Sequence, residues 1–229
     1  MRLASLQIGR PRTFSTTGSG EWWDKDWSTG IIKEAFLDKV WLGYQGLDGD
    51  GCADTKVHGG VDKAVCVYPV EHYDFWRQSL EIPDLPHGAF GENFTASDIY
   101  EDDVCVGDVY EIGGTLLQVS QPREPCWKPG HRWKIKDLAA RILQTGRTGF
   151  YFRVLRHGWV QQGETLKLIE RKHPEWNLTL CNQIMHHRKD DSDSALALSE
   201  CPSLSGSWKD TLHARYRHAS RSASLNHRS

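Results

Sequence analysis

Cys126 is the residue whose surroundings in the sequence best suit chemistry, because prolines and cations lie close to it. Pro122, Pro125 and Pro129 lack an amide donor and fix φ, so residues 121–128 are predicted to form a rigid, irregular segment. Nearby positive charge favours a thiolate, which could act as a nucleophile or as a ligand for a soft metal. A loop cysteine with solvated basic neighbours is the alternative. The cations near it are Arg123, Lys128, His131 and Arg132.

A second dense stretch of polar residues spans 54–63 and leads into the apolar run 64–68. Its candidate binding residues are Lys56, His58, Gly59, Gly60 and Lys63. Consecutive glycines let the backbone approach a ligand closely, so amides and cationic side chains could surround a phosphate together. A tight turn with exposed lysines explains the same stretch equally well. Further along, the turn in residues 90–94 offers a carboxylate from Glu92 and an amide from Asn93.

The composition limits the class of protein. Lys and Arg total 28 against 30 Asp and Glu, so a net charge of -2 favours neither nucleic acid nor an anionic membrane as a partner. No stretch approaches the ~18 consecutive apolar residues of a membrane span, and no signal peptide pattern opens the chain. We therefore expect a cytoplasmic protein.

The six cysteines are too far apart for a local metal or disulfide pattern. They stand at positions 52, 66, 105, 126, 181 and 201, without a CxxC pair. This spacing argues against a zinc ribbon, a local iron–sulfur cluster and a dense disulfide scaffold. The 10 tryptophans are many for this length, and some fall in a Gly/Ser-rich segment, 15–26, predicted to be a surface loop. Their position allows either packing or a ligand-facing or partner-facing surface.

The elements that must position these residues are mostly short strands. A hairpin is predicted over 109–112 and 115–120, with Gly113-Gly114 as its turn, and it leads directly into residues 121–128. Helical spacing of apolar residues predicts helices over 70–80 and 135–143, the second ending at Gly146. Many short strands, few helices and no repeated βα alternation predict a mainly β fold, an antiparallel barrel.

After residue 172 the sequence pattern changes from short strands to short helices. Helical patterns lie around 179–187, 193–199 and 205–217, with possible N-caps at Asn177, Ser192 and Ser205. We expect a barrel domain over 1–172 and a small three-helix subdomain over 173–217. The polar residues 218–229 are predicted to be a disordered tail.

Several short motifs occur together and in order, at residues 56–60, 68–73, 90–93, 107–108 and 118–126. With these motifs, the chain resembles the MOSC-domain family, in its YiiM-like branch associated with resistance to 6-hydroxylaminopurine. The resemblance covers roughly residues 25–217 and includes the helical region. Two features depart from it: the Trp-rich segment before Gly30 and the basic, His-rich C-terminus.

The resemblance implies a MOSC-type β-barrel that binds a pyranopterin molybdenum cofactor, with Cys126 as the molybdenum ligand. The implied reaction removes oxygen from N-hydroxylated bases and related compounds and releases the amine. Cys126 and His58 would be catalytic, and which cation contacts phosphate or substrate is left open. The cofactor-binding candidates are Lys56, His58, Gly59, Gly60, Lys63, Asn93, Arg123 and Lys128.

The reaction consumes two electrons, and the sequence contains neither a G-x-G-x-x-G dinucleotide motif nor the C-x₄-C-x₂-C spacing of a plant-type ferredoxin. We therefore expect a separate flavoprotein or ferredoxin-type reductase as the electron donor. The other expected partner is a small N-hydroxylated substrate, and a homodimer is left open. Two alternatives keep the barrel: a sulfur carrier or sulfurtransferase with a Cys126 persulfide, and a non-catalytic carrier of the cofactor.

Overall fold

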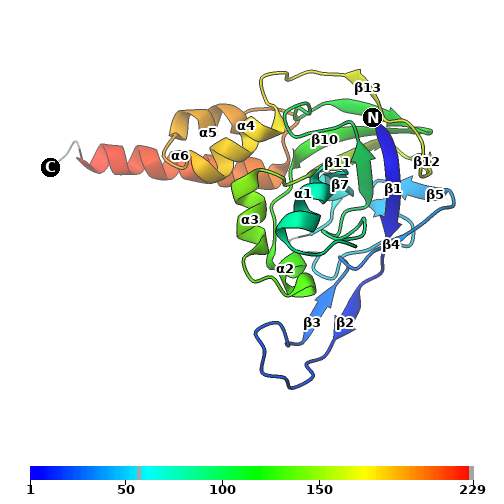
Figure 1. Cartoon of the computed structure of the whole chain (residues 1–229). Helices are drawn as coiled ribbons and strands as arrows, with labels where there is room; N and C mark the ends of the chain where they lie inside the picture. Colours follow the sequence, from blue (N-terminus) through cyan, green and yellow to red (C-terminus); the bar gives the residue numbers. More distant parts are fainter. Residues whose placement is uncertain (56–57, 227–229) are drawn as a thin grey trace.

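The main sheet of the protein has eight strands that curl into a barrel. A computed structural model of the chain describes residues 1–55 and 58–226, with side chains as far as residue 220 (Figure 1). The strand order is β13-β9-β10-β11-β7-β8-β1-β4, and all pairs except β7 with β8 are antiparallel. The strands are β1 (Arg2–Ile8), β4 (Glu34–Ala35), β7 (Val65–Pro69), β8 (Phe94–Ser97), β9 (Val109–Ile112), β10 (Thr115–Pro122), β11 (Phe150–Arg156) and β13 (Lys167–Glu170).

Backbone hydrogen bonds between β1 and the segment before β13 close the curled sheet. The amide of Leu3 donates to the carbonyl of Glu164 at 2.9 Å, and the amide of Gly163 donates to the carbonyl of Leu3 at 2.8 Å. The amide of Leu166 reaches the carbonyl of Met1 at 3.2 Å. Closure satisfies backbone groups that an open sheet edge would expose. The mainly β barrel predicted from the strand pattern is confirmed.

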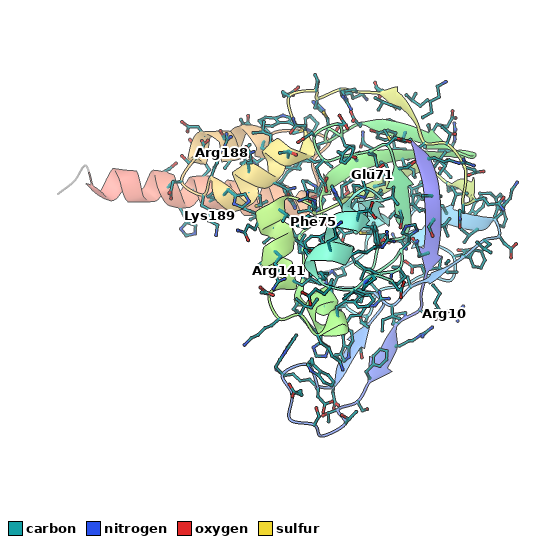
Figure 2. All side chains as sticks on the ribbon, viewed as in Figure 1. Arg10, Glu71, Phe75, Arg141, Arg188 and Lys189 are labelled. Carbon is teal, nitrogen blue, oxygen red and sulfur yellow. The ribbon has the colours of Figure 1, made fainter. Side chains whose placement is uncertain are left out.

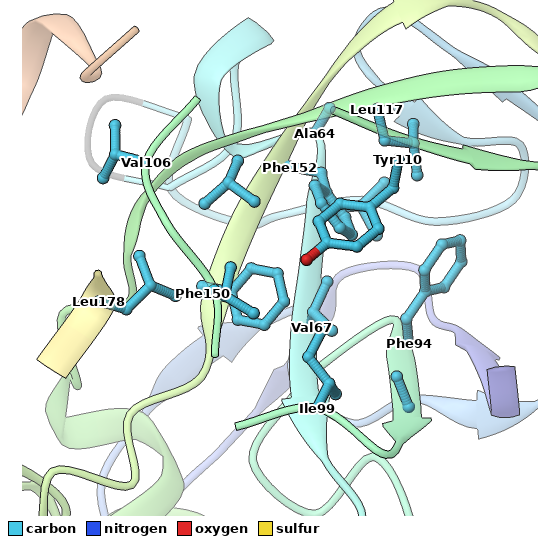
Figure 3. Packing of buried hydrophobic residues seen from close by; sticks show 14 of the residues in the cluster. Ala64, Val67, Phe94, Ile99, Val106, Tyr110, Leu117, Phe150, Phe152 and Leu178 are labelled. Atoms are coloured by element: carbon cyan, nitrogen blue, oxygen red, sulfur yellow. The ribbon is translucent and has the colours of Figure 1, made fainter. Parts of the chain in front are cut away.

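The barrel interior is filled by apolar side chains from facing strands, as Figure 3 shows for Val67, Phe94, Tyr110, Phe150 and Phe152. Strand β7 is buried along its whole length, because helix α1 (His72–Ser79) covers its outer side. There a second cluster gathers Tyr68, Tyr73, Trp76 and Phe90. Full burial of a large apolar side chain contributes roughly 1.5–3 kcal/mol, so these two clusters hold the frame of the barrel together.

Two further helices follow β10. The predicted hairpin of β9 and β10 is confirmed, with Gly113 at φ 53 in its turn. Helix α3 (Leu138–Thr145) ends at Gly146 in the left-handed region, as its sequence indicated. Helix α2 (Trp127–Trp133) corrects the prediction of an irregular segment through residue 128. Pro129 is tolerated because it lies in the first turn of α2, where its missing amide hydrogen breaks no helical hydrogen bond.

Two small sheets extend from the barrel. Strands β5 (Val40–Gly43), β6 (Gly46–Leu47) and β12 (Gly158–Val160) form one of them. Strands β2 (Arg12–Phe14) and β3 (Trp27–Thr29) form a hairpin that projects beside α2, at the bottom of Figure 1. Its loop contains the Trp-rich segment 15–26, in agreement with the predicted surface loop.

The C-terminal helices pack against one end of the barrel (Figure 1). They are α4 (Leu178–Asn182), the π-helix η2 (Gln183–His187), α5 (Ser192–Ser199) and α6 (Gly206–Asn226). Their buried residues Leu178, Leu198 and Trp208 belong to the same apolar cluster as the barrel interior. The helical region therefore shares a continuous core with the barrel. Among the described residues, no helix combines the length and apolar character needed to cross a membrane.

The helix ends differ in part from the sequence predictions. Asn177 caps α4 through a 2.8 Å bond from the amide of Leu180, as predicted, whereas the cap of α5 is Asp191 instead of Ser192. Helix α6 runs to Asn226, so the segment from residue 218, predicted to be disordered, begins as a continuation of this helix. Elongating a formed helix is cheaper than starting one, and the Ala and Arg residues there favour it.

Glycines 146 and 149 provide a matched test of the barrel's packing. Both have positive φ, at 71° and 69°, but an added Cβ meets nothing within 4 Å at Gly146 and lies 2.4 Å from the carbonyl oxygen of Val67 at Gly149. We expect Gly146→Ala to lower the free energy of unfolding by about 1–2 kcal/mol, the cost of the left-handed backbone. Gly149→Ala should cost about 1–3 kcal/mol more, because β11 must move away from β7. Chemical denaturation of both variants measures this, and equal losses would contradict the packing argument.

Candidate functional site

One cavity at the side of the barrel collects most of the predicted site residues. Its walls come from the segment after β3, the turn at β6, the loop before β7, the turn before β8 and the segment after β10. The cavity has a volume of about 120 Å³, so a larger ligand extends through its mouth. The predicted residues that line it are His58, Gly59, Lys63, Asn93, Arg123, Cys126 and Lys128.

One predicted residue within the described part of the chain does not line the cavity. Gly60 follows directly after the lining residue Gly59 but is not part of the wall. Lys56 lies outside the described residues. Of the cations close to Cys126 in sequence, His131 and Arg132 also lie away from the cavity. Arg132 instead donates through Nη1 to the carbonyls of Gly88 and Ile31, at 2.7 and 3.1 Å, and thereby ties two loops together.

Cys126 stands at the junction between β10 and α2. The ladder of β10 extends one step beyond the strand, since the amide of Arg123 donates to the carbonyl of Gly149 at 3.0 Å. Cys126 then serves as the N-cap residue of α2 in an extended conformation, and its side chain makes no capping hydrogen bond. The thiol is therefore available at the cavity wall.

Arg123 places a guanidinium inside the protein beside this thiol. It is 5 % exposed, and its Nη2 donates to the carbonyl of Phe90. Burial by itself lowers the pKa of a guanidinium, but Cys66 and Tyr151 close by raise the pKa of Arg123 above its ordinary value. Arg123 therefore stays cationic in a site shielded from water.

Lys128 brings a second buried cation into the same cavity. It is only 7 % exposed, and its ammonium has neither a hydrogen bond nor an ion pair with the described part of the chain. The ammonium is not one of the fully buried side-chain atoms without a partner, so it keeps contact with the solvent in the cavity. An anion in the cavity would give this ammonium a charged partner.

Burial and the cations around the cavity both lower the pKa of His58. Burial is the main cause that lowers its pKa below 6.5, and the charges of Lys128, Lys63 and Arg123 lower the pKa further. Its imidazole is therefore neutral at pH 7. A depressed histidine pKa beside several cations indicates a cavity with positive potential.

The loop that carries His58 requires its two glycines. Gly59 has φ 80°, and a Cβ there would lie 2.7 Å from Sγ of Cys52, which itself donates to the carbonyl of His58 at 3.2 Å. Gly60 adopts φ 83° and ψ 172°, a region open essentially to glycine alone. The Gly-Gly pair thus lets the backbone turn so that His58 and Lys63 both face the cavity.

A hydrogen-bond network supports the part of the cavity wall that contains Asp50 and Asn93. Asp50 accepts from the amide of Gly9 at 2.9 Å, from Nδ2 of Asn93 at 2.8 Å, and from the ammonium of Lys33. Oδ1 of Asn93 in turn accepts from the amide of Cys66 at 3.1 Å. The polar atoms of Asn93 are thus engaged within the protein, and this side chain orients the wall.

Asp62 connects the cavity loop to the C-terminal helices. Its carboxylate pairs with Arg153 on β11 at 3.0 Å and accepts from the amide of Gly206, the first residue of α6, at 3.1 Å. The backbone carbonyl of Asp62 accepts from Oγ of Ser120 on β10. The loop that presents Lys63 is therefore fixed to both the barrel and the helical region.

Sequence reasoning missed part of the cavity wall. The missed residues include Lys33, Asp50, Cys52, Cys66, Glu124 and Tyr151. Burial raises the pKa of the Cys66 thiol to about 11, so this second sulfur stays protonated. No local pattern marks Lys33 or Tyr151, because barrel closure alone brings them together. Cys52 directly follows the Gly-rich stretch 46–51, which was the available signal.

The fold and the cavity define a β-barrel protein with a buried, positively charged, thiol-bearing site. Comparison with protein families matches residues 54–167 to the MOSC domain and residues 181–219 to the YiiM-like, 3-alpha helix domain. The crystal structure of YiiM from Geobacillus stearothermophilus is similar to this chain with a TM-score of 0.79 and 36% identity, over 94% of this chain and 98% of that chain. The chain belongs to the MOSC-domain family, in its YiiM-like branch.

Two sequence relatives extend the comparison. The uncharacterized protein YflK of Bacillus subtilis (strain 168) is 40% identical over 205 residues, which is 90% of both chains. A protein of Gibberella moniliformis named "Reductase" is 36% identical over 180 residues, 77% of this chain. The matched part is 31% of that fungal protein, so this chain spans less than a third of it.

The pKa of His58 can serve to test whether the cavity has a positive electrostatic potential. We expect Lys128→Met to raise the pKa of His58, because it removes a cation that opposes protonation of the imidazole. Lys136→Met, at an exposed position, is the matched control and should leave that pKa unchanged. Titration of the imidazole signals by NMR measures both. An unchanged His58 pKa in Lys128→Met would place the ammonium too far away to act on the cavity.

Proposed function

We propose that the chain is a molybdenum-cofactor-dependent oxidoreductase that reduces N-hydroxylated bases and related compounds to amines. The balanced reaction is R–NHOH + 2e⁻ + 2H⁺ → R–NH₂ + H₂O. The observation that carries the proposal is the ammonium of Lys128, unpaired within the described residues, in one cavity with Arg123 and the thiol of Cys126. Membership in the MOSC-domain family and a relative named "Reductase" support the same reaction class.

The residues of the cavity fit a pyranopterin molybdenum cofactor. Such a cofactor carries a phosphate and a sulfur-rich metal centre, and when bound it supplies two-electron chemistry that side chains lack. Arg123 and Lys128 are suited to balance its negative charge, with Arg123 offering a planar fork for an oxyanion. Cys126 offers a soft sulfur ligand to the metal. Among the described residues, no group of three or more His, Cys, Asp or Glu side chains could hold a metal.

His58 is the side chain suited to move a proton in this cavity. The reaction takes up two protons, and one must reach the oxygen that leaves as water. Burial and neighbouring cations keep His58 neutral, and a bound anion would offset those cations, so that the imidazole can take up a proton from solvent and pass it on. We assign to a ring nitrogen of His58 the transfer of that proton to the leaving oxygen.

The role of Cys126 can be separated from that of its neighbour Cys52. We expect Cys126→Ser to fold normally and to lose at least about a hundredfold of kcat, because a hydroxyl is a poor substitute for a soft thiolate ligand. Cys52→Ser is the matched control: it also lines the cavity, and its hydroxyl can still donate to the carbonyl of His58. It should keep its activity.

The assay uses protein purified from a host that makes the cofactor, with a chemical reductant, an N-hydroxylated purine and metal analysis. Full turnover by a folded, molybdenum-loaded Cys126→Ser protein would falsify the ligand assignment. Absence of molybdenum together with a persulfide on Cys126 would favour sulfur transfer instead. Stoichiometric molybdenum without turnover would favour a cofactor carrier.

We also propose that a separate reductase supplies the electrons. The sequence has no dinucleotide fingerprint, and its cysteine spacing does not suit a ferredoxin-type cluster. Purified, molybdenum-loaded protein should therefore give no turnover with NADH or NADPH alone. Adding a flavoprotein or ferredoxin-type reductase should restore turnover, measured as amine product. Turnover with the nicotinamide alone, in a preparation free of other proteins, would contradict the proposal.

A further inference from the structure

The Trp-rich segment folds over helix α2 and builds an aromatic cluster beside Cys126. We define the aromatic cluster as Phe14, Trp22, Trp27, Trp127 and His131. Trp27 lies at the centre, with ring centroids 4.6 Å from His131, 5.4 Å from Phe14 and 5.9 Å from Trp127. Trp22 meets the edge of His131 at 6.1 Å. The hairpin of β2 and β3 thereby supplies three of the five rings, and α2 supplies the other two.

The aromatic cluster adjoins the cavity through the chain itself. Trp127 directly follows Cys126 and precedes Lys128, both of which line the cavity. At the other side of the cluster, Gly30 and Ile31 follow β3 and also form part of the cavity wall. Trp127 itself does not line the cavity, but its neighbours on both sides in the chain do, so the cluster begins at the cavity wall.

Trp127 presents an unusually open face for such a large apolar side chain. It is 56 % exposed, whereas Trp27 behind it is half-buried. His131, although 7 % exposed, has a ring nitrogen Nε2 without a hydrogen-bond partner in the described structure. Burial is the main cause that lowers the pKa of His131, so this ring is neutral at pH 7. The cluster is thus an uncharged aromatic surface next to a positively charged cavity.

Hydrogen bonds hold the hairpin loop in one conformation. The carboxylate of Asp24 accepts from the amides of Thr17 and Ser19, at 2.7 and 2.6 Å. The ammonium of Lys134, at the C-terminal cap of α2, lies 3.6 Å from the ring centre of Trp23. The Asp24 bonds order the loop and the Lys134 contact joins it to α2, and order that exists before binding lowers the entropic cost of binding.

We propose that Trp127, backed by Trp27, stacks on the ring of an aromatic N-hydroxylated substrate and makes the protein select planar bases over non-aromatic N-hydroxylated compounds. This inference rests on the proposed reductase function. Stacking between a base and an aromatic side chain contributes roughly 1–3 kcal/mol, which corresponds to about 5–150-fold in affinity. The open face of one indole matches one planar ring system. It is far smaller than the roughly 800 Å² that a stable protein interface buries on each side, which argues against a macromolecular occupant.

The first experiment measures substrate selectivity. The ratio of kcat/KM for 6-hydroxylaminopurine to kcat/KM for hydroxylamine is determined with a chemical reductant and molybdenum-loaded protein. We expect Trp127→Ala to lower this ratio about 5–150-fold, mainly through KM for the purine, and Trp127→Phe to restore most of it. Trp159→Ala is the matched control, because Trp159 is 55 % exposed on β12, in a different sheet. An equal loss for both substrates, or an unchanged ratio, would overturn the proposal.

The second experiment measures binding without turnover, so that the inference is tested even if the reductase assay fails. Titration of the holoprotein with adenine, the amine product, should give a dissociation constant that rises about 5–150-fold in Trp127→Ala and stays unchanged in Trp159→Ala. If adenine binding weakens only in Trp127→Ala and the protein shows no reductase activity, the proposed reaction is refuted and the aromatic subsite stands. If the protein is active but Trp127→Ala leaves the dissociation constant for adenine unchanged, the aromatic subsite is refuted and the proposed reaction stands. A loss confined to the assay driven by a partner reductase would assign Trp127 to protein docking and refute the proposal.

Discussion

The structure depends on the confinement of several cations around one cavity. The buried guanidinium of Arg123 loses hydration, and the cations around the cavity repel one another. Arg123 offsets part of this cost through the carbonyl of Phe90, whereas Lys128 has no comparable partner within the described residues. An anion bound here removes both costs. Because such a ligand binds the folded chain and not the unfolded one, its affinity adds directly to the stability of the barrel.

The cations cannot relax away from one another, because the frame holds their backbones. Arg123 extends the ladder between β10 and β11, and Asp62 fixes the loop of Lys63 to β11 and to the start of α6. The helical region therefore supports the cavity as well as covering the end of the barrel, with which it shares a core. Charges fixed in this way need no reorganisation when an anion arrives, which is the condition for strong electrostatic stabilisation in a site.

Short sequence patterns predicted those features of the structure that depend on a few adjacent residues. The hairpin of β9 and β10, the end of α3 at Gly146 and the cap at Asn177 each follow from a few adjacent residues. Much of the cavity was also within reach, because its residues cluster in two short stretches. Lys33 and Tyr151 were missed since only barrel closure brings them to the cavity. The three prolines obscured α2, and without its helical turn the orientation of its side chains could not be predicted.

The first residues of α2 connect the two chemical surfaces of the protein. Successive residues of a helix point about 100° apart, so Trp127 and Lys128 face different directions although they are neighbours. Lys128 enters the cavity beside Cys126, while Trp127 turns outward to Trp27 on the hairpin. The spacing between the positive site and the aromatic cluster is thus set by a single peptide bond and not by loop length. The contact with Trp27 fixes the indole, and in the proposed binding mode it also sets the direction from which a planar ligand approaches the thiol.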